Sequence, residues 1–319
     1  MKNLNLLSVY MLSIIGLVGC SDDNPLKREN LIEFNETDIT KSDVEEKDEI
    51  NEFSVWGEYK VEDGKEPINV FENERVYKGS NNAWTYEGSR YWNIGSYDFY
   101  AIHPITSSKS YNLAFDGKMP SEIKDVKLSN DTERLMFAMQ HKTYPFSSGE
   151  SHYVSLRFRH LMSMIGIKVK TPENMDYQIT LKSVSLYNLP VEGNCKIKKE
   201  TNDWSCTWSF TSNRTDVNNP SYYVEENKEI GTEYTPVLEP NMVFPQKFTS
   251  DNPLGIAFKY KTSKGKELFV KKELKNLELE SGQKYYLSIT IGALDNIIID
   301  QIEVDEWNSA LVGSVIVPL

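Results

Sequence analysis

Cysteine is the residue type with the clearest chemical context in this 319-residue chain. Cys20 ends the sequence Leu17-Val18-Gly19-Cys20. A positive charge at Lys2 and a mainly apolar stretch from Leu4 to Val18 come before it, so residues 1–20 have the parts of an export signal. The last four residues have the form of a bacterial lipobox, whose cysteine is acylated with palmitate-type chains. We therefore expect Cys20 to be acylated. Two or three acyl chains on this residue would anchor the protein stably, whereas a single chain gives marginal membrane binding. The alternative is an ordinary cleaved signal whose cysteine is incidental.

The other two cysteines, Cys195 and Cys206, form an even pair once Cys20 is set aside. In an exported protein such a pair is expected to form a disulfide bond. The polar segment between them is predicted to be a hairpin, so the bond would close a short loop and add at most about 2–3 kcal/mol. The alternative is two free thiols. No histidine lies near either cysteine in the sequence, so no metal site is predicted there.

The sequence contains no constellation of residues that is typical of an enzyme. The four histidines, His103, His141, His152 and His160, belong to no His-Glu-x-x-His motif, and no Gly-x-Ser-x-Gly elbow accompanies them. The many carboxylates single out no pair that would act as acid and nucleophile. We therefore predict no catalytic residue, no metal and no cofactor. His160, at the end of an apolar face, is expected to be a core histidine.

The formal net charge of the chain is −12, and most of it lies near the N-terminus. Residues 21–52 contain twelve Asp or Glu and four Lys or Arg, which gives this segment a net charge of −8. The acidity therefore belongs to a solvated tether, and the remainder of the chain is only mildly acidic. The sequence has no basic cluster that would neutralise phosphates, which argues against a nucleic-acid partner.

Strands are predicted to build the rest of the chain, because β-branched and aromatic residues are abundant and helical periodicity is scarce. Short strands, separated by turn signals such as Glu192-Gly193-Asn194 and Lys264-Gly265, predict an all-β fold of antiparallel sandwiches.

The boundary between two sandwiches is predicted from a change of parity. Apolar residues alternate at even positions over 154–158 and at odd positions over 165–169. Such a change reverses the buried face, so a bulge or a hand-over between two sheets must fall between His160 and Ile165. We accordingly place an N-terminal β-sandwich at 53–164 and a C-terminal β-sandwich at 165–319.

Aromatic residues are the remaining candidates for a binding role. Seven fall within seventeen residues: Trp84, Tyr86, Tyr91, Trp92, Tyr97, Phe99 and Tyr100. They could stack sugar rings, but alternating aromatics more often fill the core of a sandwich, and we favour that interpretation. Trp204 and Trp208, on either side of Cys206, are better candidates for an exposed ligand-binding patch.

A series of short motifs runs in a fixed order along nearly the whole chain. They are Phe53-Ser54-Val55-Trp56-Gly57, Val70-Phe71-Glu72-Asn73, Trp84-Thr85-Tyr86-Glu87, Arg90-Tyr91-Trp92, Tyr97-Asp98-Phe99-Tyr100-Ala101, Arg134-Leu135-Met136-Phe137-Ala138, Leu156-Arg157-Phe158-Arg159-His160-Leu161, Leu277 to Tyr286 and Ile302 to Trp307. In order and spacing these motifs resemble the fimbrillins of Bacteroidetes, which build type V pili. Ser21-Asp22-Asp23, directly after Cys20, is similar to the acidic tag of Bacteroidetes lipoproteins that are sent to the outer face of the outer membrane.

The resemblance implies two transthyretin-like β-sandwiches in tandem and assembly by strand exchange. In that family the precursor is exported as a lipoprotein, and a surface protease cuts after a basic residue that follows the first strand. Loss of the strand opens a hydrophobic groove, which a C-terminal strand of the next subunit fills. Physically, an unpaired edge and an empty groove are satisfied by the backbone and alternate side chains of another chain.

Mapped onto this chain, the removable first strand is 31–39 and the cut follows Lys41. The family typically has arginine at that place, so lysine implies either a lysine-tolerant protease or a member that is never cut. The donor strand is 312–319, and its candidate donor residues are Val312, Val315, Val317 and Leu319. The alternative is that this segment is a plain terminal strand of the second domain.

The leading hypothesis is a stalk or tip subunit of a cell-surface fimbria that supports adhesion. Its partners would be other fimbrillin subunits and, through the lipid on Cys20, the outer membrane. The second hypothesis is a non-polymerising pilus anchor or a surface lipoprotein that binds host or bacterial glycans or proteins, for which Trp204 and Trp208 are the candidate patch. The third is a sandwich-fold glycosidase, which no constellation in the sequence supports.

Overall fold

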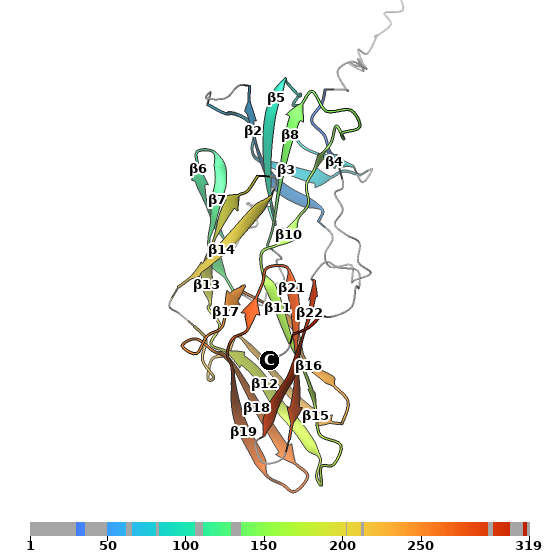
Figure 1. The fold of residues 1–319 in the computed structure, drawn as a ribbon, viewed down its shortest axis with the longest axis vertical. Coiled ribbons are helices and arrows are strands. Elements are labelled where there is room, and N and C mark those ends of the chain that lie inside the picture. Colours follow the sequence, from blue (N-terminus) through green and yellow to red (C-terminus); the bar gives the residue numbers. More distant parts are fainter. Residues whose placement is uncertain are drawn as a thin grey trace, which may run out of the picture.

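A computed structural model of the chain describes residues 30–35, 50–61, 66–80, 83–105, 111–128, 135–201, 203–211, 214–292, 296–306 and 315–317. All regular secondary structure in these ranges is strand, so the predicted all-β class is confirmed. Within them, no helix is long and apolar enough to cross a membrane. The strands form an elongated molecule with two lobes, one above the other in Figure 1.

The first lobe is built on a six-stranded antiparallel sheet. In spatial order its strands are β10 (Arg159–His160), β8 (Met136–Tyr144), β5 (Gly95–His103), β2 (Glu52–Lys60), β3 (Ile68–Lys78) and β4 (Trp84–Thr85). Every residue from Tyr97 to Ile102 on β5 is buried. Since successive side chains of a strand point to opposite faces, both faces of this sheet must be covered.

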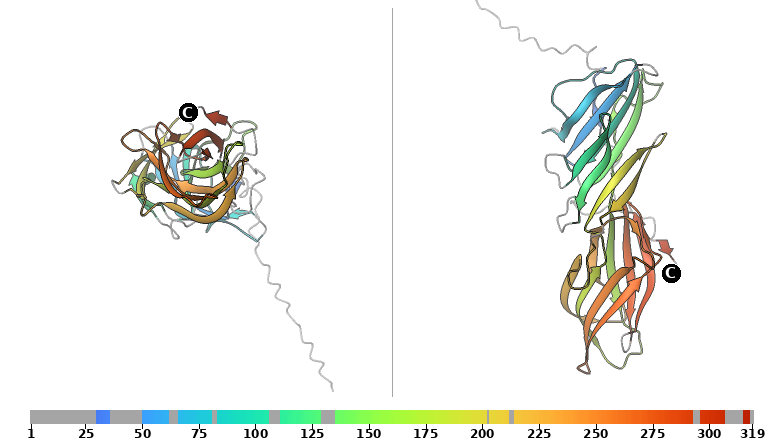
Figure 2. Two further views of the ribbon diagram at one scale, coloured as in Figure 1. Left: turned by 90° about the horizontal axis from the view of Figure 1, so that it is seen from below. Right: turned by 90° about the vertical axis from the view of Figure 1, so that its left-hand side faces the viewer.

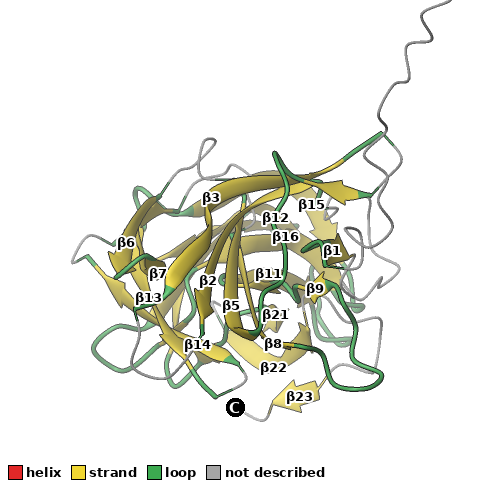
Figure 3. Ribbon diagram, turned by 90° about the horizontal axis from the view of Figure 1, so that it is seen from above, coloured by secondary structure: helices red, strands yellow, loops and turns green. Residues whose placement is uncertain are grey.

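A four-stranded sheet covers one face of the six-stranded sheet. Its order is β14 (Trp204–Phe210), β13 (Glu192–Lys199), β7 (Met119–Lys127) and β6 (Asn112–Asp116). Tyr100 and Ile102 of β5 pack against it. On the opposite face, Tyr97, Phe99 and Ala101 pack against residues 32–34 and 154–158. There β1 (Phe34–Asn35) pairs with β9 (Val154–Ser155), and the two lie side by side in Figure 3.

The second lobe is a sandwich of two sheets around one large apolar core. One sheet has the order β16 (Thr235–Val243), β11 (Ser163–Lys170), β21 (Gln283–Ile291), β22 (Ile297–Glu306) and β23 (Val315–Val317). The other has the order β15 (Tyr222–Ile230), β12 (Ile179–Tyr187), β18 (Leu254–Thr262) and β19 (Glu267–Leu274). A short pair, β17 (Gln246–Lys247) and β20 (Glu278–Leu279), lies beside them. Figure 2 shows the two lobes from a second side.

The parity change marks the passage from one lobe to the other. β10 ends at His160 within the first-lobe sheet, and β11 begins at Ser163 within the second-lobe sheet. The hand-over between two sheets therefore lies inside the predicted interval. The chain then returns, because β13 of the β13–β14 hairpin pairs with β7 of the first lobe. Residues 192–211, counted with the C-terminal sandwich from the sequence, thus complete a first-lobe sheet.

One predicted turn is wrong. Glu192-Gly193-Asn194 lies within β13 and not between strands. Gly193 faces Phe210 of β14, and a Cβ at this glycine would come within 2.9 Å of the Phe210 ring. The glycine therefore permits close packing of an aromatic ring across a strand pair, which is a second common reason for glycine in a strand.

Candidate functional site

Residues 30–35 lie within the first lobe as a short inserted strand. On one side the segment runs antiparallel to residues 90–92, with a bridge between Leu31 and Tyr91, and on the other it runs parallel to β9. Backbone hydrogen bonds join it to both neighbours: Ile32 N to Arg90 O at 2.8 Å, Trp92 N to Asn30 O at 2.7 Å and Val154 N to Glu33 O at 2.8 Å. The part of the predicted first strand that the structure describes, residues 31–35, thus lies between two other segments.

Two side chains of this strand are buried in the first-lobe core. Ile32 is fully buried and Phe34 is 6% exposed. They are two residues apart, so both point to the same face of the strand. Leu31 and Glu33, at the alternate positions, are more exposed. Burial of two such side chains stabilises the bound strand by about 1.5–3 kcal/mol each.

Four aromatic rings surround the ring of Phe34. The centroid distances are 5.5 Å to Phe71, 5.8 Å to Phe53, 5.9 Å to Tyr86 and 6.4 Å to Phe99, all with edge-to-face geometry. This arrangement is favoured by the ring quadrupoles beyond simple burial of area. Phe71 and Phe99 belong to β3 and β5, so the six-stranded sheet forms the floor of the groove that the strand occupies.

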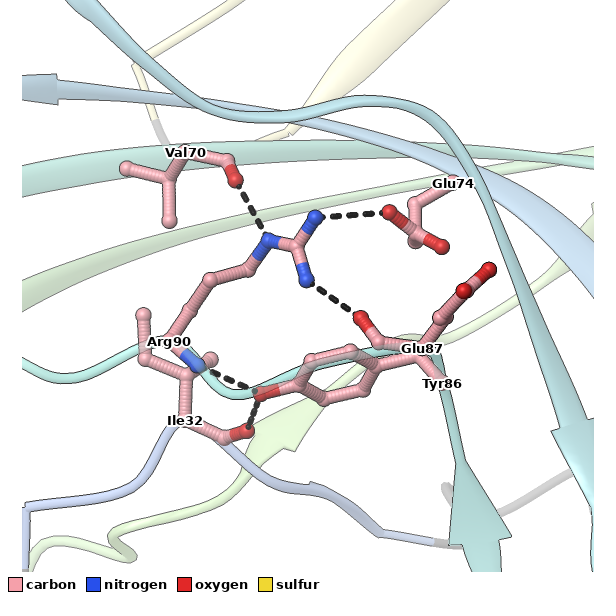
Figure 4. Close-up of polar contacts among 6 residues, drawn as sticks. All are labelled: Ile32, Val70, Glu74, Tyr86, Glu87 and Arg90. Atoms are coloured by element: carbon pink, nitrogen blue, oxygen red, sulfur yellow. Dashed lines mark hydrogen bonds and ion pairs between the residues drawn. The ribbon is translucent and has the colours of Figure 1, made fainter.

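Tyr86 and Arg90 fasten the strand from the side (Figure 4). The Tyr86 hydroxyl donates to the carbonyl of Ile32 at 2.7 Å and accepts from the backbone N–H of Arg90 at 3.3 Å. Burial raises the pKa of Tyr86 above its ordinary value, so the hydroxyl stays protonated and able to donate. Because the acceptor of this bond is a backbone carbonyl, Tyr86 can hold a strand of any sequence in this place.

The Arg90 guanidinium holds its own loop in place. It donates to Val70 O at 2.9 Å and to Glu87 O at 2.6 Å, and it pairs with Glu74 Oε2 at 2.7 Å. It also lies over the rings of Phe71 and Tyr86, at 4.9 Å and 5.3 Å from their centroids. These contacts belong to the groove and not to the inserted strand. The sequence reasoning missed Tyr86 and Arg90 as groove residues, although both lie in motifs that it had noted.

The predicted aromatic core is confirmed in most of its members. Trp92, Tyr97, Phe99 and Tyr100 are buried, whereas Tyr91 is 44% exposed. Trp84 and Tyr86 are partly buried against the same core. Trp84, Tyr86, Trp92, Tyr97 and Phe99 thus belong to the core around the inserted strand, whereas Tyr100 packs on the opposite face of the six-stranded sheet.

The C-terminal segment pairs with the second lobe. β23 runs antiparallel to β22, with Val315 opposite Val304 and Val317 opposite Ile302. A groove of about 660 Å³ lies along β22, between residues 272–278 and a second set of residues that comprises 296–299, Ile302 and Val304. Val312 and Leu319 lie outside the described residues, as do Cys20 and Lys41. The roles predicted for these residues in lipidation, cleavage and strand donation stay predictions.

Cys195 and Cys206 are both free thiols in the structure, so the predicted disulfide bond is not formed in it. Cys195 faces Trp208 and Cys206 faces Ile197, which makes the cysteines diagonal neighbours on one face of the β13–β14 hairpin. Diagonal neighbours are about 7–8 Å apart, at or beyond the limit of disulfide geometry. A hydrogen bond between the thiols raises the pKa of buried Cys195 and lowers the pKa of Cys206.

Trp204 and Trp208 do not form the exposed patch that the sequence suggested. Trp204 is 7% exposed, and its ring packs edge-to-face on Phe137 at 4.8 Å, beneath the Arg159 guanidinium at 4.1 Å. Trp208 is partly buried against Phe244, and its indole N–H donates to the carbonyl of Leu161 at 3.1 Å. The alternate residues of β14 are the exposed ones, so the hairpin turns its tryptophans toward the six-stranded sheet.

A polar cluster joins the two sheets of the first lobe. Asp98, on β5, is buried and hydrogen-bonded to Lys199 of β13, and its Oδ1 lies 2.8 Å from His141 Nδ1 of β8. Burial tends to raise the pKa of Asp98, but the bonds to Lys199 and His141 outweigh it and hold that pKa below its usual value. The cluster holds the hairpin against the sheet.

The predictions for histidine and metals can be compared with the described part of the chain. His160 is 1% exposed, so its prediction as a core histidine is confirmed. Among the residues that the structure describes, no three His, Cys, Asp or Glu side chains gather in a way that would hold a metal ion.

Comparison with known proteins gives both a family and a fold. The model of the fimbrillin-like family matches residues 37–307. A fimbrial protein from Bacteroides vulgatus has a similar structure, with 18% sequence identity and a TM-score of 0.61 over 87% of this chain and 99% of that one. A putative cell adhesion protein from Parabacteroides distasonis has 12% identity and a TM-score of 0.52 over 89% and 98% of the two chains. One from Bacteroides uniformis has 16% identity and a TM-score of 0.51 over 87% and 97%. The sequence matches none of the curated proteins.

Proposed function

Because the chain belongs to the fimbrillin-like family, we propose that it is a structural subunit of a cell-surface fimbria, assembled by strand exchange after its N-terminal segment is cut away. The observation that carries this proposal is the inserted strand of residues 30–35. It supplies Ile32 and Phe34 to a core that the rest of the first lobe builds around them.

The proposed precursor is anchored in the outer membrane through lipid on Cys20. The acidic tether leads from that cysteine to the inserted strand, and Lys41 follows the strand at a distance of six residues from Asn35. A cut after Lys41 would separate the strand covalently from the rest of the subunit. The strand would then be held by its backbone bonds, the hydrogen bonds from Tyr86 and Tyr144 and two buried side chains, and another strand could replace it.

The proposed donor is residues 312–319 of a neighbouring subunit. In this segment Val315, Val317 and Leu319 recur every second residue, as Ile32 and Phe34 do in the inserted strand. Within the described residues, β23 pairs with β22 over three residue pairs, at the edge of its sheet. An edge strand has one neighbour in the sheet, so it gives up hydrogen bonds on one side alone when it leaves. The proposal assigns the protein an assembly and adhesion role and no catalytic step.

The test is limited proteolysis of the full-length protein with a lysine-specific protease. Residues 36–49 contain two lysines, Lys41 and Lys47, so the matched control is the double variant Lys41→Gln/Lys47→Gln. We expect the wild type to lose its N-terminal segment, to begin at Ser42 or, after a second cut at Lys47, at Asp48 by intact mass, and to form ladders on gels. The control is expected to stay monomeric. A wild-type protein that loses the segment and remains a stable monomer would show that the assembly route is wrong.

A second candidate function follows from the lysine at position 41, where arginine is typical of the family. If the protein is not cut in its own cell envelope, the lipid on Cys20 keeps it attached to the membrane permanently. The chain is then a non-polymerising anchor. N-terminal sequencing of the protein from surface fractions distinguishes the two, because the anchor begins at Cys20 and the cut subunit at Ser42. For a glycan-binding lipoprotein, the second form of this hypothesis, the candidate patch is not accessible because Trp204 is buried.

A further inference from the structure

The groove around residues 30–35 has a side-chain preference that the C-terminal segment of this chain does not meet. This inference rests on the strand exchange proposed above and concerns the kind of donor that the groove accepts. The inserted strand shows directly which side chains fit, since Ile32 and Phe34 occupy two adjoining sites on its floor and are almost wholly buried.

The site of Phe34 is shaped for an aromatic ring. Its walls are the edges and faces of Phe53, Phe71, Tyr86 and Phe99, each in edge-to-face contact with Phe34. An aliphatic side chain in the same place would lose these contacts and would leave space between the rings.

Other contacts keep the rings in place when the site is filled differently. Phe53 also packs on Trp84 and Phe158, at centroid distances of 5.1 Å and 5.2 Å. Phe99 packs on Trp92 at 5.8 Å. Phe71 lies beneath the Arg90 guanidinium, which is itself bonded to Val70 and Glu74. Because these rings also pack against residues outside the site, they cannot move in fully around a side chain smaller than Phe34.

The candidate donor in this chain carries no aromatic residue. Residues 308–319 read Asn-Ser-Ala-Leu-Val-Gly-Ser-Val-Ile-Val-Pro-Leu. Val315 and Val317 have the same spacing as Ile32 and Phe34, so valine or leucine would enter the aromatic site in every register that keeps the alternation. The backbone part of the groove, in which Tyr86 binds a carbonyl, does not discriminate between donors.

We infer that the groove is selective for a donor strand from a different subunit, one that carries an aromatic side chain two residues from an aliphatic one. Residues 312–319 of a second copy of this chain are a poorer fit. The subunit would therefore assemble preferentially in a mixed fimbria, next to a partner with an aromatic donor strand. With copies of itself it would pair more weakly, as in ladders of the purified protein.

The experiment measures peptide binding to the protein folded as a full chain and then cut after Lys41. A fluorescent peptide of residues 30–40 is bound to the vacated groove and displaced by unlabelled peptides. These are residues 30–40, residues 308–319, and residues 308–319 with Val317→Phe, which restores an aliphatic and an aromatic residue at the spacing of Ile32 and Phe34. The matched control is residues 308–319 with Ile316→Phe, whose ring points to the opposite face of the strand.

We expect residues 308–319 to bind roughly tenfold to a hundredfold more weakly than residues 30–40. Val317→Phe should recover at least about tenfold, and Ile316→Phe should recover none. Equal or tighter binding of the unmodified 308–319 peptide, or equal gains from both phenylalanine peptides, would overturn the selectivity while leaving strand exchange in place. If the segment leaves and not even residues 30–40 bind again, the groove itself is not an acceptor and both proposals fail.

Discussion

Phe34→Ala is the substitution that tests the inserted strand most directly. Phe34 is 6% exposed and contacts four rings, so its truncation removes a buried aromatic and leaves a cavity between side chains that are held in place. Buried Phe→Ala changes cost about 3–5 kcal/mol. Because the strand can detach as a unit, the loss cannot exceed the free energy with which the strand binds in its groove. We therefore expect Phe34→Ala to lower the free energy of unfolding by about 3 kcal/mol.

The assay for Phe34→Ala is urea unfolding followed by tryptophan fluorescence. Trp56, Trp84 and Trp92 lie in the first lobe, so the signal reports on the lobe that holds the strand. Hydrogen exchange at the Val154 amide, which donates to Glu33 O, reports release of the strand alone. The control is Phe269→Ala in the second lobe, where the ring is 58% exposed and the expected change is within about 0.5 kcal/mol. If Phe34→Ala matches this control, and exchange at Val154 is unchanged, the strand does not contribute as we have argued.

Three further predictions test other parts of the structure. Tyr86→Phe removes the hydroxyl that donates to Ile32 O and should lower the unfolding free energy of the first lobe by about 0.5–1.5 kcal/mol, measured in urea. Gly166→Ala would place a Cβ 2.9 Å from Leu238 O and should cost about 1–3 kcal/mol, whereas Gly231→Ala, with open space around it, should have little effect on thermal unfolding. Asp98→Asn should destabilise the protein most near neutral pH. The pKa of Asp98 in the folded state is below its ordinary value of 3.8, so its charge stabilises the folded protein fully above pH 3.8. This stabilisation is lost as the pH falls through the lower, folded-state pKa. The difference in stability between wild type and Asp98→Asn should therefore shrink below pH 3.8, and a gap that stays constant with pH would contradict this assignment.

Alternation of apolar residues carried most of the fold prediction. The all-β class and the passage between sheets near His160 follow from spacing alone, because side-chain direction in a strand has a period of two. The aromatic run of β5 was also interpreted correctly as core. Its residues are buried on both faces, so apolar residues occur at both parities and the alternation is hidden there.

The errors concern which element covers which face. Trp204, Cys206 and Trp208 alternate with polar residues, so the sequence shows that one face of this strand is apolar. It does not show that the six-stranded sheet of the other half of the chain buries that face. The same applies to Gly193, whose role depends on a ring across the hairpin, and to Cys195 and Cys206, whose diagonal register depends on the pairing of the two strands.

The groove residues show a second limit of prediction from sequence, which concerns neighbours that are distant in the chain. The removable strand was placed at 31–39 through family resemblance, and its neighbours, Arg90 and Val154, are about 60 and 120 residues away in the chain. No local pattern indicates which distant segments will flank a strand. Tyr86 could have been noted because it is an aromatic residue with a polar end, and such a side chain usually finds a hydrogen-bond partner when buried.

The return of the β13–β14 hairpin to the first lobe also affects the order in which the protein can mature. A chain that emerges from a membrane pore with its N-terminus first presents residues 30–160 well before residues 192–211. During that interval β7 lacks its neighbour β13, Phe137 on the large sheet lacks the Trp204 ring that packs on it, and Asp98 has no lysine partner. The lobe that contains the groove is thus completed late, by a segment that arrives after the second lobe has begun to form. An inserted strand that keeps the opposite side of the sheet filled would protect the unfinished lobe from association with other chains until that segment arrives.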